Sequence, residues 1–466
     1  MDFKSVFSHV GMILEMFAIM SLIPIFISFI FGENMYTPFF LTAVLSFAIG
    51  SLLDKKFPKN DLDLGSSMAV ASISFVLLSL FGAIPFLPYA SPVDAVFESV
   101  SGFTTTGLSV LNVELIPNTL LFWRSFTQWI GGIGILLIFL LLVGSPGISS
   151  NYLYKAEARE EKIEASIQHT VKKIFKIYGM YTIVGIILLS LVGMPIFDAI
   201  LVSFSSISTG GFTAKAGGIG AYNIPMAEFV IVLLMIVGAT SFFIHDKLLK
   251  KQLFTYVRNA ETKLFWGLIA VFASLLTISF LDTGQGFRHG IFLAFSALTT
   301  TGFTTTSQIP PISMLLLIIL MVIGGYAGST AGGIKLIRFG IIGKSIPWLA
   351  RKISYPPEAV IHFKIKEKTI KESELTIISL FISIYIIILL IGTVVITFLG
   401  YSPLDAFFHV TSAQGSVGLS TIPLADMHFV GKIMLMINML LGRLEIFPFI
   451  ILLYAFYRKK IRRSSF

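Results

Sequence analysis

Ten apolar segments, each of a length suited to crossing a lipid bilayer, constrain this chain more than any other feature of its sequence. They cover residues 10–31, 38–53, 67–86, 120–143, 177–194, 226–244, 264–281, 313–336, 375–399 and 433–457. A helix needs about 20 apolar residues to cross a hydrocarbon core roughly 30 Å thick. Only 13% of the residues are charged, about half the share in soluble domains. We therefore predict an all-α polytopic membrane protein with about ten spanning helices.

The basic residues gather in alternate connections between these segments. Of the 34 Lys and Arg residues, 29 lie at residue 4 or within 55–59, 155–176, 247–263, 335–371 and 458–463. Basic residues accumulate on the cytoplasmic side of membrane proteins, so we expect a cell (cytoplasmic) membrane location with both termini in the cytoplasm. The net charge of +9 then reflects topology, and we expect no nucleic acid as a partner.

The sequence also argues against an enzyme. It has no cysteine and seven scattered histidines, so thiol catalysis and cysteine-ligated metals are excluded. No histidine is followed by glutamate, which excludes the HExxH zinc motif.

Four segments rich in Thr, Ser and Gly repeat along the chain: residues 103–109, 208–213, 298–304 and 415–420, here called loops 1 to 4. Each contains a glycine followed by Leu or Phe and then a hydroxyl residue, and these glycines are 104, 91 and 116 residues apart. Such a period suits duplicated helical hairpins. We predict an extra N-terminal hairpin (1–63) and four repeats, at 64–154, 155–258, 259–362 and 363–466.

A short helix is predicted before each loop. Asp94, Asp198 and Asp405 stand thirteen residues before the loop glycine, each shortly after a proline, and His289 takes this place in the third repeat. Proline followed by an acid marks a helix start, where we expect the carboxylate to cap free N–H groups. Such a helix is too short to cross the membrane. Irregular backbone is tolerated at membrane depth only where it is buried or lines water, so the four loops should surround a wet pathway.

The loops offer backbone carbonyls and few charges. Glycine allows positive φ, which lets successive carbonyls turn toward one axis. A ring of carbonyls replaces the hydration shell of a monovalent cation in potassium filters, and four loops on one chain would close one ring.

Together with residues 123–132, 324–335 and 442–446, the loops resemble those of the Trk/Ktr superfamily of potassium transporters. The extra hairpin is most similar to the TrkH branch, whereas residues 416–420 are more similar to the filter of the KtrB branch. The resemblance implies four helix–pore-helix–helix repeats around a pseudo-fourfold pore, in a homodimer with one pore per subunit. It also implies a TrkA-like cytosolic regulatory ring that holds the nucleotide, with potassium as substrate and no covalently bound cofactor.

The same resemblance assigns the potassium-coordinating positions. They would be Thr105, Thr106, Gly107, Thr209, Gly210, Gly211, Thr300, Thr301, Gly302, Ser416, Val417 and Gly418.

Residues 324–335, here called the gate segment, contain the predicted intramembrane gate loop, 324–333. This loop interrupts an apolar span with five glycines, which favours a helix break. The resemblance implies a mobile intramembrane gate formed by Gly324, Gly325, Gly328, Ser329, Thr330, Gly332, Gly333, Lys335 and, from the last span, Arg443. Close helix packing through small residues is the alternative. Lys335 and Arg338 are expected to contact anionic headgroups.

Arg443 lies about ten residues into the last apolar segment, where a charge is costly and therefore paired or functional. A salt bridge with Glu445 is disfavoured because residues two apart on a helix face different sides. The predicted function is potassium uptake through a carbonyl-lined filter, gated by the gate segment and the cytosolic partner. The alternative is a sodium- or proton-coupled alkali-cation carrier with alternating access.

Overall fold

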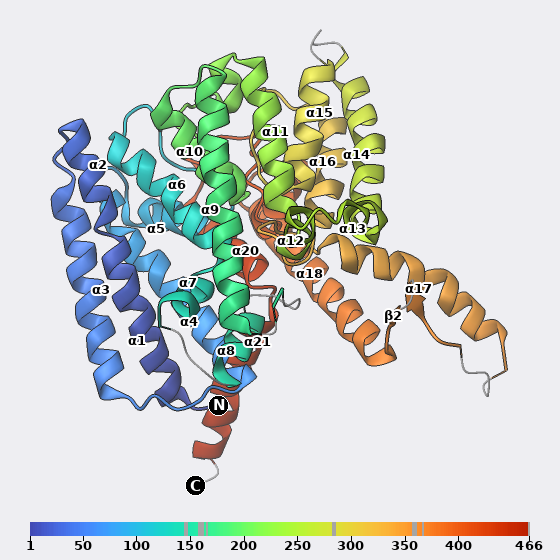
Figure 1. The fold of residues 1–466 in the computed structure, drawn as a ribbon, viewed down its shortest axis with the longest axis horizontal. Helices are drawn as coiled ribbons and strands as arrows, with labels where there is room; N and C mark the ends of the chain where they lie inside the picture. Colours follow the sequence, from blue (N-terminus) through green and yellow to red (C-terminus); the bar gives the residue numbers. More distant parts are fainter. Residues whose placement is uncertain are drawn as a thin grey trace.

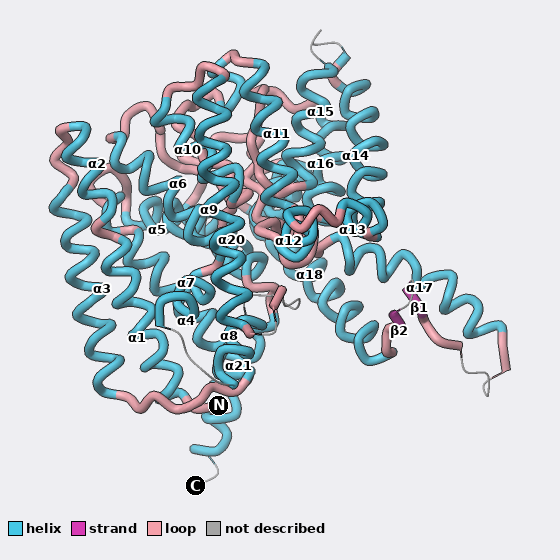
Figure 2. Tube along the Cα trace, in the orientation of Figure 1, coloured by secondary structure: helices cyan, strands magenta, loops and turns pink. Residues whose placement is uncertain are grey.

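The computed structural model describes residues 1–143, 148–156, 163–164, 166–281, 286–356, 361–365 and 368–464. Within these ranges the chain is nearly all helical (Figures 1 and 2). Arg159, Lys162 and Lys366, which belong to the predicted cytoplasmic segments, lie outside the described residues.

The helices follow the predicted order of long, short and long elements. The N-terminal hairpin and first repeat hold α1 (Phe3–Met20), α2 (Ile23–Phe31), α3 (Tyr36–Lys56), α4 (Leu64–Gly82), η1 (Ile84–Phe86), α5 (Pro92–Phe103), α6 (Asn118–Ile133), α7 (Ile135–Val143) and α8 (Ile148–Ala156). Next come α9 (Ile167–Leu191), α10 (Ile196–Ile207), η2 (Gly218–Tyr222), α11 (Pro225–Ala239), α12 (Phe242–Leu249) and α13 (Leu253–Arg258). The rest holds α14 (Ala260–Ser279), α15 (Gly286–Leu298), α16 (Pro311–Ile323), α17 (Leu336–Ser354), β1 (Lys364–Ile365), β2 (Lys368–Thr369), α18 (Glu372–Phe398), α19 (Pro403–Gln414), α20 (Phe429–Arg443) and α21 (Phe447–Ser464).

Six helical stretches in the described part of the chain are long and apolar enough to cross a membrane, and up to nine if each sharply bent helix pair is one span. The bends are 73° between α6 and α7, 108° between α11 and α12, and 103° between α20 and α21. The predicted run 313–336 is helical only over α16, which ends where Gly324 takes a φ of 72°. These features confirm the predicted all-α polytopic membrane class.

One carboxylate of the N-terminal hairpin binds the start of a helix in the first repeat. Glu33, between α2 and α3, accepts hydrogen bonds from the backbone N–H groups of Asn118 (2.8 Å) and Thr119 (2.9 Å) at the start of α6. These N–H groups have no partner within their own helix, and the positive end of the helix dipole favours a negative charge there. Glu33 thus fixes α6 relative to α1–α3.

The short helices α5, α10, α15 and α19 have 12 or 13 residues, about 18–20 Å at 1.5 Å per residue, too short to cross. The predicted capping by aspartate is wrong in detail. Ser91 and Ser402 are the N-caps of α5 and α19, and they accept hydrogen bonds from the N–H groups of Asp94 and Asp405. Because serine precedes the proline in both segments, its side chain reaches the third helical N–H first. The aspartates instead accept from these serine hydroxyls, at 2.7 and 2.6 Å.

Candidate ion-conduction site

The four loops share one unusual backbone conformation. Their first filter positions, Thr105, Thr209, Thr300 and Ser416, have φ values of 54°, 53°, 56° and 52°. The loop glycines two residues later also have positive φ, from 78° to 98°. Positive φ is uncommon for any residue other than glycine and rare for a β-branched residue such as threonine. Its occurrence at four equivalent positions indicates that the same structural constraint acts on the backbone of all four loops.

Hydrogen bonds to the short helices set the direction of the loop carbonyls. The N–H groups of Thr106, Gly210, Thr301 and Val417 donate to the carbonyls of Ser101, Ser205, Ser296 and Ser412, at 2.8–2.9 Å. In a trans peptide, the N–H of one residue and the C=O of the residue before it point in opposite directions. The carbonyls of the four first positions therefore point away from the short helices.

The loops also touch one another in cyclic order. A Cβ atom on Gly107 would overlap the carbonyl oxygen of Gly210 in loop 2. The same atom on Gly211 would overlap Thr301 of loop 3, and on Gly302 it would overlap Val417 of loop 4. On Gly418 it would overlap Thr106 of loop 1, which closes the ring. The structure thus brings eight of the twelve predicted filter residues into direct contact in one ring, and only glycine fits at its four contacts. The other four, Thr105, Thr209, Thr300 and Ser416, are their neighbours in the chain.

Gln128 is a component of this ring that the sequence reasoning missed. Its side chain, fully buried on α6, donates to the carbonyl of Gly210 at 2.6 Å and accepts from the N–H of Phe212 at 3.1 Å. Helix α6 follows loop 1 in the chain, so Gln128 holds loop 2 in a fixed position relative to the helix that follows loop 1. The available signal was a side-chain amide within a predicted membrane span.

Three ion pairs lie among the helices that flank the loops. Arg124 and Glu98 are both buried and lie 2.6 Å apart. Arg124 also donates to the carbonyl of Thr213, the last residue of loop 2, at 3.0 Å, and its guanidinium lies 4.0 Å from the ring centroid of Phe212. The other two pairs are Arg288 with Glu228 and Lys432 with Asp94. Each of these joins helices from two different repeats.

The gate segment lies directly against the loops. The N–H of Gly332 donates to the Thr300 hydroxyl at 2.7 Å, and the Thr330 hydroxyl lies 3.2 Å from that of Thr209. A Cβ on Gly332 would overlap the carbonyl of Gly415 in loop 4. The segment therefore contacts loops 2, 3 and 4 itself.

Arg443 completes the set by joining the gate segment to loop 1. Its guanidinium donates to the Thr105 hydroxyl at 3.2 Å and to the Thr330 carbonyl at 3.0 Å. It also donates to the carbonyls of Gly131 and Gly132 at the end of α6. Glu445, two residues later in the chain, lies 2.5 Å from Arg338.

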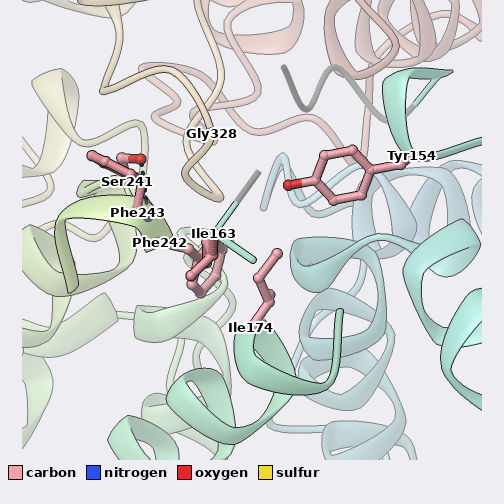
Figure 3. A pocket seen from close by; sticks show the side chains of 7 residues that line it. All are labelled: Tyr154, Ile163, Ile174, Ser241, Phe242, Phe243 and Gly328. Carbon is pink, nitrogen blue, oxygen red and sulfur yellow. Dashed lines mark hydrogen bonds between the residues drawn. The ribbon is translucent and has the colours of Figure 1, made fainter. Parts of the chain in front are cut away.

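Little space surrounds the gate segment. The two ends of the gate loop are in contact: a Cβ on Gly324 would overlap the Gly332 carbonyl and the Cα of Gly333. The Lys335 ammonium donates to the Ala331 carbonyl within the segment. Gly328, at the tip, borders a cavity of about 10 Å³, room for about one water molecule. Figure 3 shows the cavity lining: Tyr154, Ile163, Ile174, Ser241, Phe242, Phe243 and Gly328.

Comparisons with known proteins agree with this architecture. The sequence matches the TrkH family model, described as a cation transport protein, over residues 37–459. It is 34% identical to an uncharacterized cation transporter of Methanocaldococcus jannaschii, over 99% of this chain and 97% of that protein. It is 30% identical to the Trk system potassium uptake protein TrkH of Escherichia coli K12, over 97% and 98%. The crystal structure of the potassium transporter TrkH from Vibrio parahaemolyticus superposes with a TM-score of 0.86 at 27% identity, covering 97% of this chain and 99% of that one.

Replacing Gln128 by Leu should lower the thermal unfolding temperature of the purified protein. The change leaves the buried Gly210 carbonyl and Phe212 N–H without their partner, at a cost of about 1–3 kcal/mol for each group. The matched control is Gln308→Leu, because the Gln308 side chain is exposed on a surface loop. Equal unfolding temperatures for the two variants would remove Gln128 from the support of loop 2.

Proposed function

Because the chain belongs to the TrkH family of cation transport proteins, we propose that it takes up potassium ions through a pathway encircled by loops 1 to 4. Family membership makes it a multi-pass membrane transporter and not an enzyme, as the sequence analysis expected. The observation that carries the proposal is the closed ring of glycine-to-carbonyl contacts between successive loops.

The filter chemistry rests on carbonyl oxygens. A potassium ion sheds its water where oxygens of fixed direction replace the hydration shell. The N–H groups tied to the short helices support carbonyls directed at the axis from Thr105, Thr209, Thr300 and Ser416. Gly210 has a second role, because its carbonyl also accepts from Gln128. The remaining proposed filter residues follow these positions in the four loops.

The gate segment in its present position is a closed gate in this proposal. It is hydrogen-bonded to hydroxyls of the proposed filter, and Arg443 places a positive charge beside the same residues. A guanidinium there raises the barrier to a cation. The cavity beside Gly328 has room for only about one water molecule, so opening requires movement of neighbouring helix ends such as those of α8 or α12.

We infer that the end of the molecule where α1 begins and α21 ends faces the cytoplasm (Figure 1). Both chain ends belong to the basic segments that the positive-inside rule assigns to the cytoplasm. A cytosolic nucleotide-binding ring, which the sequence resemblance implies, would dock at this face. A homodimer with one pathway per subunit and the repeat boundaries given above belong to the same proposal.

Expression of the chain should restore growth at low external potassium in a bacterium that lacks potassium uptake. Failure to restore growth while the protein is present in the membrane would contradict the transport proposal. In proteoliposomes, a reversal potential set by potassium alone would identify passive conduction. A reversal potential that shifts with a sodium or proton gradient would identify the coupled carrier, for which the bent helix pairs α11–α12 and α20–α21 are also suited.

Replacing Gly107 by Ala should reduce the preference for potassium over sodium by about tenfold. The new Cβ overlaps the Gly210 carbonyl, and positive φ alone costs a non-glycine residue roughly 1–2 kcal/mol. Gly193→Ala is the matched control, since Gly193 has a φ of 96° but no atom within 4 Å of the added Cβ. Competition fluxes in proteoliposomes measure the effect. Unchanged selectivity in a folded Gly107→Ala protein would exclude Gly107 from the filter.

Replacing Thr330 by Val should increase potassium flux through the protein without its partner. The hydroxyl has one proton to donate and lies 3.0 Å from the Ile207 carbonyl and 2.8 Å from the Gly238 carbonyl, and valine has the same shape without this donor. Losing one donated hydrogen bond, worth about 1 kcal/mol, should raise the open population roughly fivefold. Thr376→Val, on the exposed surface of α18, should leave flux unchanged. Equal flux in both variants would show that Thr330 does not hold a gate closed.

A further inference from the structure

A second cavity, of about 440 Å³, lies away from the four loops, where the ends of several helices meet. It is bordered by the first turns of α4, α17 and α18, the last residues of α8, and the break between α20 and α21. Its volume falls within the range of roughly 300–1,000 Å³ typical of small-molecule sites. The adjoining helix ends belong to the side of the molecule inferred above to face the cytoplasm.

Most of the lining is hydrocarbon. Phe381 and Phe447 face the cavity from α18 and α21, with Met68 from α4 and Ile377 and Ile378 from α18. An ion pathway needs polar groups to replace hydration, and these side chains offer none. An acyl chain, in contrast, gains free energy from contact with such a surface.

Three charged residues also border the cavity: Lys155, Arg338 and Glu445. Lys155 is exposed at the end of α8. Arg338 pairs with Glu445 at 2.5 Å, and its guanidinium lies 4.6 Å from the ring centroid of Phe381. The two basic groups exceed the single carboxylate, so the border of the cavity is complementary to an anion. Basic pockets between helices on the cytoplasmic side are a recurring type of site for anionic lipid headgroups.

We propose that this cavity binds an anionic phospholipid, with one acyl chain against Phe381 and Phe447 and the phosphate between Lys155 and Arg338. Arg338 lies three residues after Lys335 of the gate segment, and Glu445 two residues after Arg443. A phosphate bound to Arg338 would weaken the ion pair between Arg338 and Glu445, which connects α17 to the break between α20 and α21. Lipid binding would therefore change how readily the gate segment moves. This last step rests on the proposed function, whereas the binding itself does not.

Native mass spectrometry of the purified full-length protein tests the binding without any transport assay. The protein is given phosphatidylglycerol and phosphatidylcholine in equal amounts, and we expect it to retain phosphatidylglycerol preferentially. Lys155→Gln should lower that preference about fivefold, the loss expected for one basic contact at a membrane surface. Ile377→Trp should abolish it by filling the cavity. Leu380→Trp is the matched control, because Leu380 is 53% exposed and Ile377 56% exposed on the same helix, but only Ile377 lines the cavity.

The results separate the possible occupants. Retention of phosphatidylglycerol by Leu380→Trp but not by Ile377→Trp, with a weakened preference in Lys155→Gln, supports the proposal. Equal retention of both lipids by the unaltered protein would show a non-specific apolar contact and overturn it. An unchanged preference in either Lys155→Gln or Ile377→Trp would also overturn it. A protein that fails to take up potassium but binds lipid as described would refute the proposed function and leave the lipid site standing.

Discussion

The contact between each loop glycine and a carbonyl of the next loop is the constraint on which the rest of the structure depends. It requires a glycine at Gly107, Gly211, Gly302 and Gly418, because any Cβ would overlap backbone. It also requires positive φ at the residue two positions earlier, where threonine or serine is strained. Backbone of this kind persists only where its surroundings hold it in place. Four short helices provide that support through the same N–H to carbonyl bond in every repeat.

The surroundings of the ring are correspondingly polar and buried. Arg124 and Glu98 form an ion pair with almost no solvent contact, and removing one partner of such a pair typically costs about 3–5 kcal/mol. Gln128 and Arg443 reach from α6 and α20 to residues of other repeats. These side chains turn four separate hairpins into one unit. The gate segment is hydrogen-bonded to that same unit, so a movement of the segment would break hydrogen bonds to the loops.

Local patterns were sufficient to predict the helical class and the four loops, because apolar length indicates a membrane span and a segment rich in Thr, Ser and Gly indicates a helix end. They were not sufficient for every span: about ten were predicted, whereas the described residues have six to nine stretches of spanning length, and the run 313–336 is broken after α16. Contacts between distant residues could not be predicted in the same way. Glu33 contacts α6 some 85 residues later in the chain, and Gln128 contacts Gly210 across 82 residues. Local sequence patterns do not identify contacts between residues that are more than 80 positions apart in the chain. The assignment of the cap to Asp94 in place of Ser91 failed for a different reason, because both residue types accept the same hydrogen bond and only geometry decides.

The central claim is that carbonyl oxygens of the four loops surround a dehydrated alkali ion. A crystal structure of the protein grown with rubidium or thallium, whose anomalous scattering locates the ion, tests this most directly. The account predicts an anomalous peak on the axis of the ring, within coordinating distance of the carbonyls of Thr105, Thr209, Thr300 and Ser416. An empty ring, with the ion bound at side-chain carboxylates elsewhere in the protein, would contradict it.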